Sequence, residues 1–176
     1  MKTSIFIVIL IATGIFTSVF QTGKADEIKN QSALNAGSEN PRIKHFRLGK
    51  NNTAIDGYDP VSYFKSGPKK GRSDLSYNCN GVVYQFASLE NLNEFKNHPE
   101  AYEPAWGGWC GHAMAMRGEK VEINPECYKI VNGRNVLFFK SIWANALTNW
   151  EKEIQKTPEN TLMAKGDAFW NKTLSQ

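Results

Sequence analysis

Apolar and polar positions alternate at two places in the middle of the chain, and each place predicts a β-hairpin. The first runs from Leu75 to Phe86 around an Asn80-Gly81 pair, and the second covers residues 121–139 around Asn132-Gly133. Asn-Gly is typical of two-residue hairpin turns, because the central residues of these turns need positive φ angles. Each segment is therefore expected to form two antiparallel strands.

Between and after the hairpins, the apolar spacing changes to that of helices. Ser88 is a suitable N-cap for a helix over Leu89–Asn97, where Leu89, Leu92 and Phe95 share one face and Pro99 ends the pattern. From Ser141 onward a second helical face is made by Trp143, Leu147, Trp150 and Ile154. A last helix follows Pro158. The predicted class is α+β: small antiparallel β-hairpins with a short intervening helix and C-terminal helices.

Residues 1–25 have the pattern of a secretory signal peptide. Lys2 precedes the apolar stretch Ile5–Phe20, and the small residues Gly23 and Ala25 suit cleavage after Ala25. An uncleaved anchor is the alternative, but the stretch is slightly short for a span and no basic cluster follows it. We therefore expect an exported protein, periplasmic or extracellular, with no stable membrane insertion after signal cleavage.

The remaining chain divides into three parts. Residues 26–48 are polar and are predicted to form a loosely ordered leader or linker, in which His45 is exposed. Residues 49–140 carry both hairpins and the short helix, and are expected to form one domain. Residues 141–176 are expected to form a helical tail that packs on this domain.

Composition and charge exclude several classes of protein. A hydrophobic content of 41% with 12% aromatic residues excludes a wholly disordered chain. The formal net charge is +4, and two of the lysines lie in the signal segment. The remainder is too balanced for a surface that tracks phosphates, so no nucleic-acid partner is expected, and a protein partner stays unknown.

Five short motifs occur in order between about residues 52 and 140. They are Ala54-Ile-Asp-Gly-Tyr-Asp-Pro-Val-Ser-Tyr-Phe64, Tyr77-x6-Tyr84-x-Phe86-Ala-Ser88, Asn91-Leu-Asn-Glu-Phe95, Pro99-Glu-Ala-Tyr102-x-Pro104 and Trp106-Gly-Gly-Trp-Cys110. Together they resemble the YHS-domain family, in its exported single-domain bacterial form. YHS domains occur in copper-transporting ATPases and in some hydroxylases and are proposed to bind metal. The resemblance therefore implies a metal-binding role, although no His lies between Tyr84 and Ser88 here.

One segment concentrates donors for a soft metal ion. These donors are Cys110, His112, Met114 and Met116. Thiolate, imidazole and thioether are the ligands that Cu(I) prefers, so copper is the expected metal. In an extended segment all four donors point to one side. In a helix, Cys110 shares a face with Met114 while His112 shares the other face with Met116, and further ligands are then needed. Core packing of Cys and Met is the alternative interpretation.

A second hypothesis needs no metal. Four aromatic residues would form a pocket for a small ligand or a protein partner: Tyr58, Tyr84, Trp106 and Trp109. An enzyme that uses Cys110 ranks last, because the chain has no phosphate-binding loop, nucleophile elbow or zinc-protease motif. The stretch from Asp56 to Pro60 is expected to be a turn in which Asp59 bonds its own backbone.

Three cysteines in an exported chain raise the question of a disulfide. An odd number leaves at least one thiol free in a monomer. We expect a cross-sheet disulfide between Cys79 and Cys127, because both lie in or beside hairpins and export means an oxidising compartment. Two isolated thiols, or Cys110 joined to one of them, are the alternatives.

Overall fold

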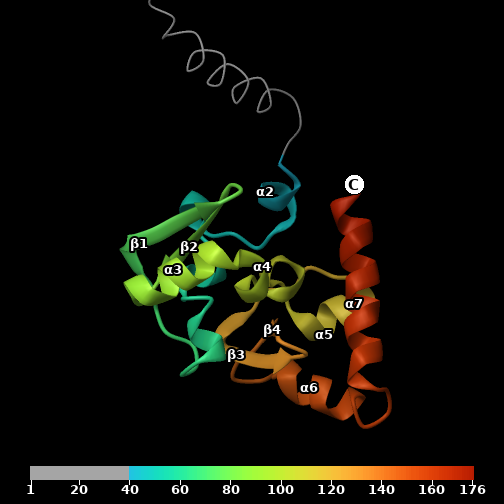
Figure 1. Ribbon diagram of the computed structural model, residues 1–176. Coiled ribbons are helices and arrows are strands. Elements are labelled where there is room, and N and C mark those ends of the chain that lie inside the picture. The colour runs from blue at the N-terminus through green and yellow to red at the C-terminus, as the bar shows by residue number, and fades with distance from the viewer. Residues whose placement is uncertain (1–39) are drawn as a thin grey trace, which may run out of the picture. The chain divides into compact units, whose positions relative to one another are not determined.

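Two antiparallel hairpins and six α-helices make up residues 40–176, the part of the chain that the computed structural model describes (Figure 1). This arrangement confirms the predicted α+β class. The predicted signal peptide and most of the predicted leader lie outside the described residues. No helix within residues 40–176 is both long and apolar enough to cross a membrane.

The first hairpin pairs β1 (Arg72–Cys79) with β2 (Val82–Phe86), and Tyr77 lies opposite Tyr84. Asn80 and Gly81 form the turn with φ angles of 50° and 89°, as their sequence predicts. Alternate residues of β2 are fully buried, so one face of this hairpin packs on the core.

The second hairpin pairs β3 (Asn124–Val131) with β4 (Arg134–Phe138), and Asn132 and Gly133 form its turn with φ angles of 50° and 73°. It is a separate two-stranded sheet. Residues 135–138 of β4 are all buried, so both faces of this strand are covered. Strand β4 thus lies inside the fold, while β3 and the turn keep part of their surface exposed.

Helix α3 (Leu89–Asn97) is capped by Ser88, whose Oγ accepts a 3.1 Å hydrogen bond from the backbone N–H of Asn91. Phe95 is fully buried, with its ring centroid 4.7 Å from that of Tyr84. Leu89 was expected on the same buried face but is 59% exposed, because it occupies the first position of the helix, ahead of the turns that pack.

Short helical segments connect the hairpins to one another and to the C-terminal helices. Helix α4 (Pro99–Tyr102) and η4 (Ala105–Gly108) lead into α5 (Gly111–Arg117). The C-terminal part holds α6 (Ala146–Glu153) and α7 (Glu159–Leu174). Three single turns of 3₁₀-helix precede β1: η1 (Lys50–Asn52), η2 (Ile55–Gly57) and η3 (Ser62–Phe64).

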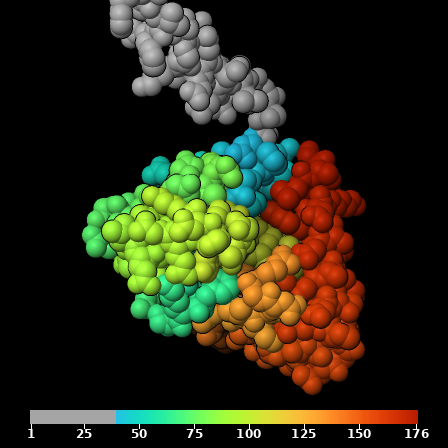
Figure 2. Space-filling model, viewed as in Figure 1, coloured from blue at the N-terminus to red at the C-terminus, as the bar shows by residue number. Residues whose placement is uncertain are grey.

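The folded part begins earlier than the predicted boundary at residue 49. Helix α2 (Pro41–His45) lies between the first hairpin and α7 (Figure 2), and Asn40 caps it by accepting from the backbone N–H of Arg42 at 3.0 Å. His45 is only 7% exposed and lies 3.0 Å from the Lys120 ammonium. The prediction that His45 is exposed is therefore wrong, because a polar stretch gives no signal of the neighbours that cover it.

Helix α6 begins at Ala146 and not near Ser141. The side-chain oxygen of Asn145 accepts from the Leu147 backbone N–H at 3.0 Å and caps the helix there. Trp150 is fully buried as expected, whereas Trp143 lies in the preceding loop with 90% of its surface exposed. The helical spacing of Trp143 was therefore misleading, because the Asn145 cap starts the helix after it.

The C-terminal helices pack on the rest of the fold. Gly166 of α7 lies directly against the Trp106 ring, so a Cβ at this position would overlap the indole. Phe169 of α7 contacts Gly118 at the end of α5, at a position that a side chain on residue 118 would fill. Aromatic rings from the tail and from the central segment thus share one core.

Candidate ligand cavity

The expected soft-metal donors lie at the N-cap of α5 and along this helix, and they differ in burial. Cys110 is the N-cap residue of α5 and is 1% exposed, and its Sγ accepts from the backbone N–H of Phe139 at 3.4 Å. Met114, one turn later, is fully buried. These two sulfur atoms belong to the core.

The other two donors follow the opposite side of α5. His112 is partly buried, and burial lowers the pKa of its imidazole below the usual 6.5, with the Arg117 charge acting in the same direction. Met116 is 39% exposed. Residues two apart on a helix point about 200° apart, so His112 and Met116 do not share the face of the buried Met114.

The copper site predicted at these donors has no supporting cluster of ligands in the described residues. The buried sulfur pair would need further ligands, and no group of three or more His, Cys, Asp or Glu residues within residues 40–176 is arranged to hold a metal ion. A copper site at Cys110, His112, Met114 and Met116 stays a prediction from the sequence, without geometric support at these residues.

All three cysteines are buried free thiols within the described chain. Cys79 lies in β1, where burial and the charge of Glu103 raise its pKa. Cys127 lies in β3, where burial again raises the pKa and its Sγ contacts the Asn145 side-chain oxygen at 3.5 Å. The three thiols are free in the structure, so the expected Cys79–Cys127 disulfide stays a prediction from the sequence.

The four aromatic residues expected to form one pocket are dispersed. The Tyr58 hydroxyl donates to Glu126 at 3.1 Å, and Trp109 donates from its indole to the His45 carbonyl at 2.7 Å. Of the four, only Trp106 lines the cavity described next. Tyr84 reaches it indirectly, because its hydroxyl donates at 3.1 Å to Glu103, which lines the cavity.

A cavity of about 350 Å³ opens between α2, α4, η4 and α7. Its lining comes from segments far apart in the sequence: Pro41, Arg42, Phe46, Glu100, Ala101, Glu103, Pro104, Ala105, Trp106, Gly107, Arg134, Trp170 and Leu174. Its size is within the range of small-molecule sites, which are typically about 300–1,000 Å³.

Three aromatic side chains give the cavity its apolar surface. The ring centroids of Phe46 and Trp170 are 5.7 Å apart, and Trp106 lies beneath α7 with 2% of its surface exposed. Gly107 allows this approach, because a Cβ on it would come within 2.8 Å of the Trp170 ring and 2.9 Å of the Phe46 ring. Its φ of 62° also favours glycine. Gly107 therefore allows the Phe46 and Trp170 rings to pack against the backbone at the cavity.

Two arginines stand beside these rings, and each is held by a carboxylate. Arg42 makes a two-pronged ion pair with Glu103, and its Cζ lies 4.5 Å from the Phe46 ring centroid. Burial alone would lower the Arg42 pKa, but the hydrogen bond and charge of Glu103 outweigh it and raise the pKa. Burial also raises the pKa of Tyr84 well above its usual value, aided by Glu103, so Tyr84 stays a donor.

Arg134 is fixed in a similar way on the other side. Its Nη1 lies 2.9 Å and 3.0 Å from the two carboxylate oxygens of Asp167, and its Cζ lies 5.5 Å from the Trp106 ring centroid. Asp167 also accepts from the Trp106 indole N–H at 2.9 Å. Within residues 40–176, the Nε and Nη2 groups of Arg134 have no hydrogen-bond partner, so they remain donors for a ligand.

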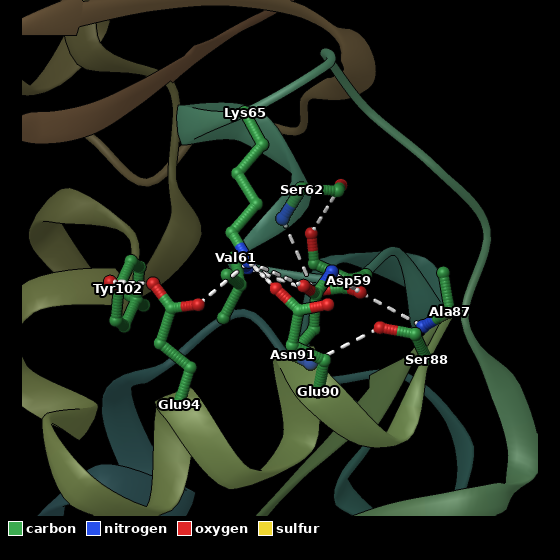
Figure 3. Close-up of polar contacts among 10 residues, drawn as sticks. All are labelled: Asp59, Val61, Ser62, Lys65, Ala87, Ser88, Glu90, Asn91, Glu94 and Tyr102. Carbon is green, nitrogen blue, oxygen red and sulfur yellow. Dashed lines mark hydrogen bonds and ion pairs between the residues drawn. The ribbon is translucent and has the colours of Figure 1, made fainter.

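A second polar cluster is structural. Asp59 is fully buried, and its Oδ1 accepts from the backbone N–H groups of Val61 (2.9 Å) and Ser62 (3.3 Å), as the predicted turn requires. Its Oδ2 accepts from the Ala87 backbone N–H at 2.8 Å and from the Asn91 amide at 2.6 Å (Figure 3). All four donors satisfy the carboxylate, so this cluster fastens the first hairpin to α3 and offers no open site.

Sequence reasoning missed most residues of the cavity. Arg42 and Phe46 fall in the segment predicted as a loose leader, while Glu103, Arg134 and Trp170 come from three other segments. The motif Trp106-Gly107-Gly108 was the one available signal, since glycines beside a tryptophan indicate close packing against the backbone. Nothing in the sequence indicates that the other segments meet there.

Comparisons with known protein families, curated proteins and solved structures found no match for this chain. The resemblance to YHS domains therefore rests on the five motifs alone. The functional interpretation rests on the geometry of the cavity.

Proposed function

We propose that this chain is a small-ligand-binding module whose site is the cavity between α2, α4, η4 and α7. The observation that carries the proposal is that three aromatic rings and two arginines line one opening, and that each arginine is ion-paired with a carboxylate. This is the metal-free alternative weighed from the sequence, with a different set of residues.

The lining favours a flat, partly apolar ligand that carries hydrogen-bond acceptors. Phe46 and Trp170 provide apolar ring surface at the opening, and the buried Trp106 ring supports them from below. The Nε and Nη2 groups of Arg134 have no acceptor within residues 40–176, so they can donate to a ligand. The ion pair with Asp167 holds the guanidinium in place before a ligand binds. A fixed donor loses less conformational entropy on binding than a mobile one.

Calorimetric titration with three indoles tests the proposal and the preferred charge of the ligand. The probes are indole, indole-3-acetate and tryptamine, which share a ring and differ in charge. We expect saturable binding that is tightest for indole-3-acetate, because its carboxylate can accept from Arg134. Absence of saturable binding for all three probes would contradict the proposal.

Variants then place the binding in the cavity. Trp170→Ala should weaken indole-3-acetate binding by about tenfold or more through the loss of the ring contact. Ala101→Trp fills the opening from an exposed position of α4, so it should block binding without unfolding the protein. Tyr58→Phe is the matched control, because Tyr58 lies outside the cavity lining. Equal affinity in all three variants would place the binding elsewhere.

Copper binding is tested separately. Cu(I) is titrated into the reduced protein while its melting temperature and metal content are followed, and the titration is repeated with Cys110→Ser and His112→Ala. The buried position of Cys110 leads us to expect no stoichiometric binding that depends on these two residues. Stoichiometric uptake that both variants abolish would restore the copper hypothesis.

A further inference from the structure

The loop between β4 and α6 presents two large apolar side chains to solvent. Ile142 is 88% exposed and Trp143 is 90% exposed. The other exposed large apolar residues in the described chain reach at most 59%, at Leu89. Adjacent side chains that are almost wholly exposed differ from the single, partly covered apolar residues that are normal on protein surfaces.

The backbone of this loop is held in place by its own polar groups. The Ser141 side-chain oxygen accepts from the backbone N–H groups of Trp143 (3.2 Å) and Ala144 (3.1 Å). The Ser141 backbone N–H donates to the Ala144 carbonyl at 2.8 Å, and an isolated bridge pairs Lys140 with Asn145 at the base of the loop. Ile142 and Trp143 therefore project from a preformed turn.

The hydrogen bonds of the loop backbone bear on which kind of surface the loop can bind. Entry into a medium of low polarity is costly for backbone N–H groups that lack a partner. Here the N–H groups of Ser141, Trp143 and Ala144 already have acceptors within the loop. When such a tip leaves water, the Ile142 N–H is the only one of these four backbone N–H groups that lacks an acceptor within the described residues.

One lysine without an ion-pair partner in the described chain lies beside the tip. Lys140 is the charged residue of the loop and forms no ion pair within residues 40–176, and no Asp or Glu occurs in the sequence between Glu126 and Glu151. The basic groups of β3 and β4, Lys129 and Arg134, are paired with carboxylates of α6 and α7. The exposed Glu126 of β3 accepts from the Tyr58 hydroxyl at 3.1 Å. Lys140 is thus a cation available beside the apolar tip.

We propose that this loop docks on an anionic lipid surface, with Ile142 and Trp143 entering the interfacial layer and Lys140 contacting lipid phosphates. Tryptophan favours the membrane–water interface because its ring is apolar while its N–H needs a polar partner. A typical protein interface covers about 800 Å² on each partner, which two protruding side chains do not provide. A fluid lipid surface needs no matching shape.

The test uses the full chain as purified from its producing cells, mixed with vesicles whose acyl chains are brominated. Vesicles contain phosphatidylcholine alone or with phosphatidylglycerol. The readout is the emission of Trp143, obtained as the difference between the unchanged protein and Trp143→Phe. This local signal is chosen because the N-terminal apolar segment could by itself attach the chain to vesicles. We expect quenching of Trp143 that is strongest with phosphatidylglycerol.

Two further variants make the result decisive. Lys140→Gln should reduce quenching on phosphatidylglycerol vesicles by about threefold or more, because one unpaired positive charge is lost near the surface. Leu89→Trp in the Trp143→Phe background places an exposed indole on α3 as the matched control, and we expect it to stay unquenched. No quenching of Trp143, equal quenching of the α3 indole, or an unchanged Lys140→Gln signal would each overturn the proposal.

Discussion

Asp59 shows, at the scale of a single residue, how a buried charge is stabilised by local donors. Its two oxygens accept four hydrogen bonds from η3, from the end of β2 and from α3 (Figure 3). Lys65 lies near the same helix and pairs with Glu90 (3.1 Å) and Glu94 (2.7 Å). The buried carboxylate therefore fixes the position of α3, while the exposed lysine contacts its outer side.

The substitution Asp59→Asn should strongly destabilise the protein. It replaces one oxygen by an NH₂ group that faces two donors, so we expect a loss of about 2–4 kcal/mol in the free energy of unfolding. Urea denaturation followed by circular dichroism measures this. The control is Asp74→Asn, whose partner Arg72 is also exposed and which should leave stability nearly unchanged. Similar losses in both variants would contradict the assigned role.

The sequence indicates single residues well when their partners are local. Asn-Gly turns, the Ser88 cap and the turn at Asp59 were all predictable, because each depends on neighbours within a few positions. The Asp59 bonds to Ala87 and Asn91 were not predictable, since they span 28 and 32 positions. Distant partners leave no periodic signal in one sequence.

At the scale of elements, the contact between α7 and η4 depends on the absence of a side chain at Gly166. Glycine weakens a helix by about 1 kcal/mol relative to alanine, so α7 gives up some intrinsic stability there. Because residue 166 has no side chain, the buried Trp106 ring can lie directly against the backbone of α7. The close contact holds one wall of the cavity in place.

We expect Gly166→Ala to destabilise the protein in spite of its better helix propensity. Overpacking against a buried ring costs about 1–3 kcal/mol, which exceeds the propensity gain in most of that range. Thermal unfolding of Gly166→Ala and of Lys165→Ala, an exposed neighbour on α7, supplies the comparison. A melting temperature of Gly166→Ala above that of the unchanged protein would show that the contact is not tight.

The start of α7 also predicts a pH dependence. Burial alone would raise the Glu159 pKa, but hydrogen bonds from Lys129 (2.8 Å) and from the Trp150 indole (2.7 Å) lower it below 4.5. A lowered pKa in the folded state means that Glu159 adds stability above pH 4.5, and this stability is lost as the pH falls through the folded-state pKa.

Glu159→Gln removes this acid-sensitive contribution. At neutral pH the variant should be less stable by roughly 1 kcal/mol, and the gap should close on acidification below about pH 4.5. Melting temperatures across this range measure the gap. Glu119→Gln, which loses an exposed pair with Arg117, should show no comparable change. A constant gap at all pH values would refute the linkage.

At the scale of the whole molecule, the arrangement of the cysteines predicts how many free thiols the protein has. Cys79, Cys110 and Cys127 are buried and unpaired in the described chain. Protein that is purified and unfolded without reductant should therefore have three thiols that react with Ellman's reagent. In the native protein the same thiols are buried and should react slowly. Ellman's reagent measures both. One thiol in place of three would show that two of the three cysteines form a disulfide.

The sequence predicted the architecture better than the site. Hairpin turns and the α3 cap lie in local patterns, so the order of elements was largely predictable. The cavity was not, because Arg42, Arg134 and Trp170 come from segments that only tertiary packing brings together. Trp143 shows the reverse error, since helical spacing placed it in the core while the Asn145 cap leaves it outside.

The Asp59 contacts bear on the order in which the protein is synthesised and matures. Every donor to this carboxylate lies at or before Asn91, so a nascent chain carries the complete set before β3, β4 and α7 have been made. The cavity requires Trp170 of α7, which is synthesised long after Asn91. The Asp59 contacts can thus form during translation before the residues that complete the cavity lining have been made.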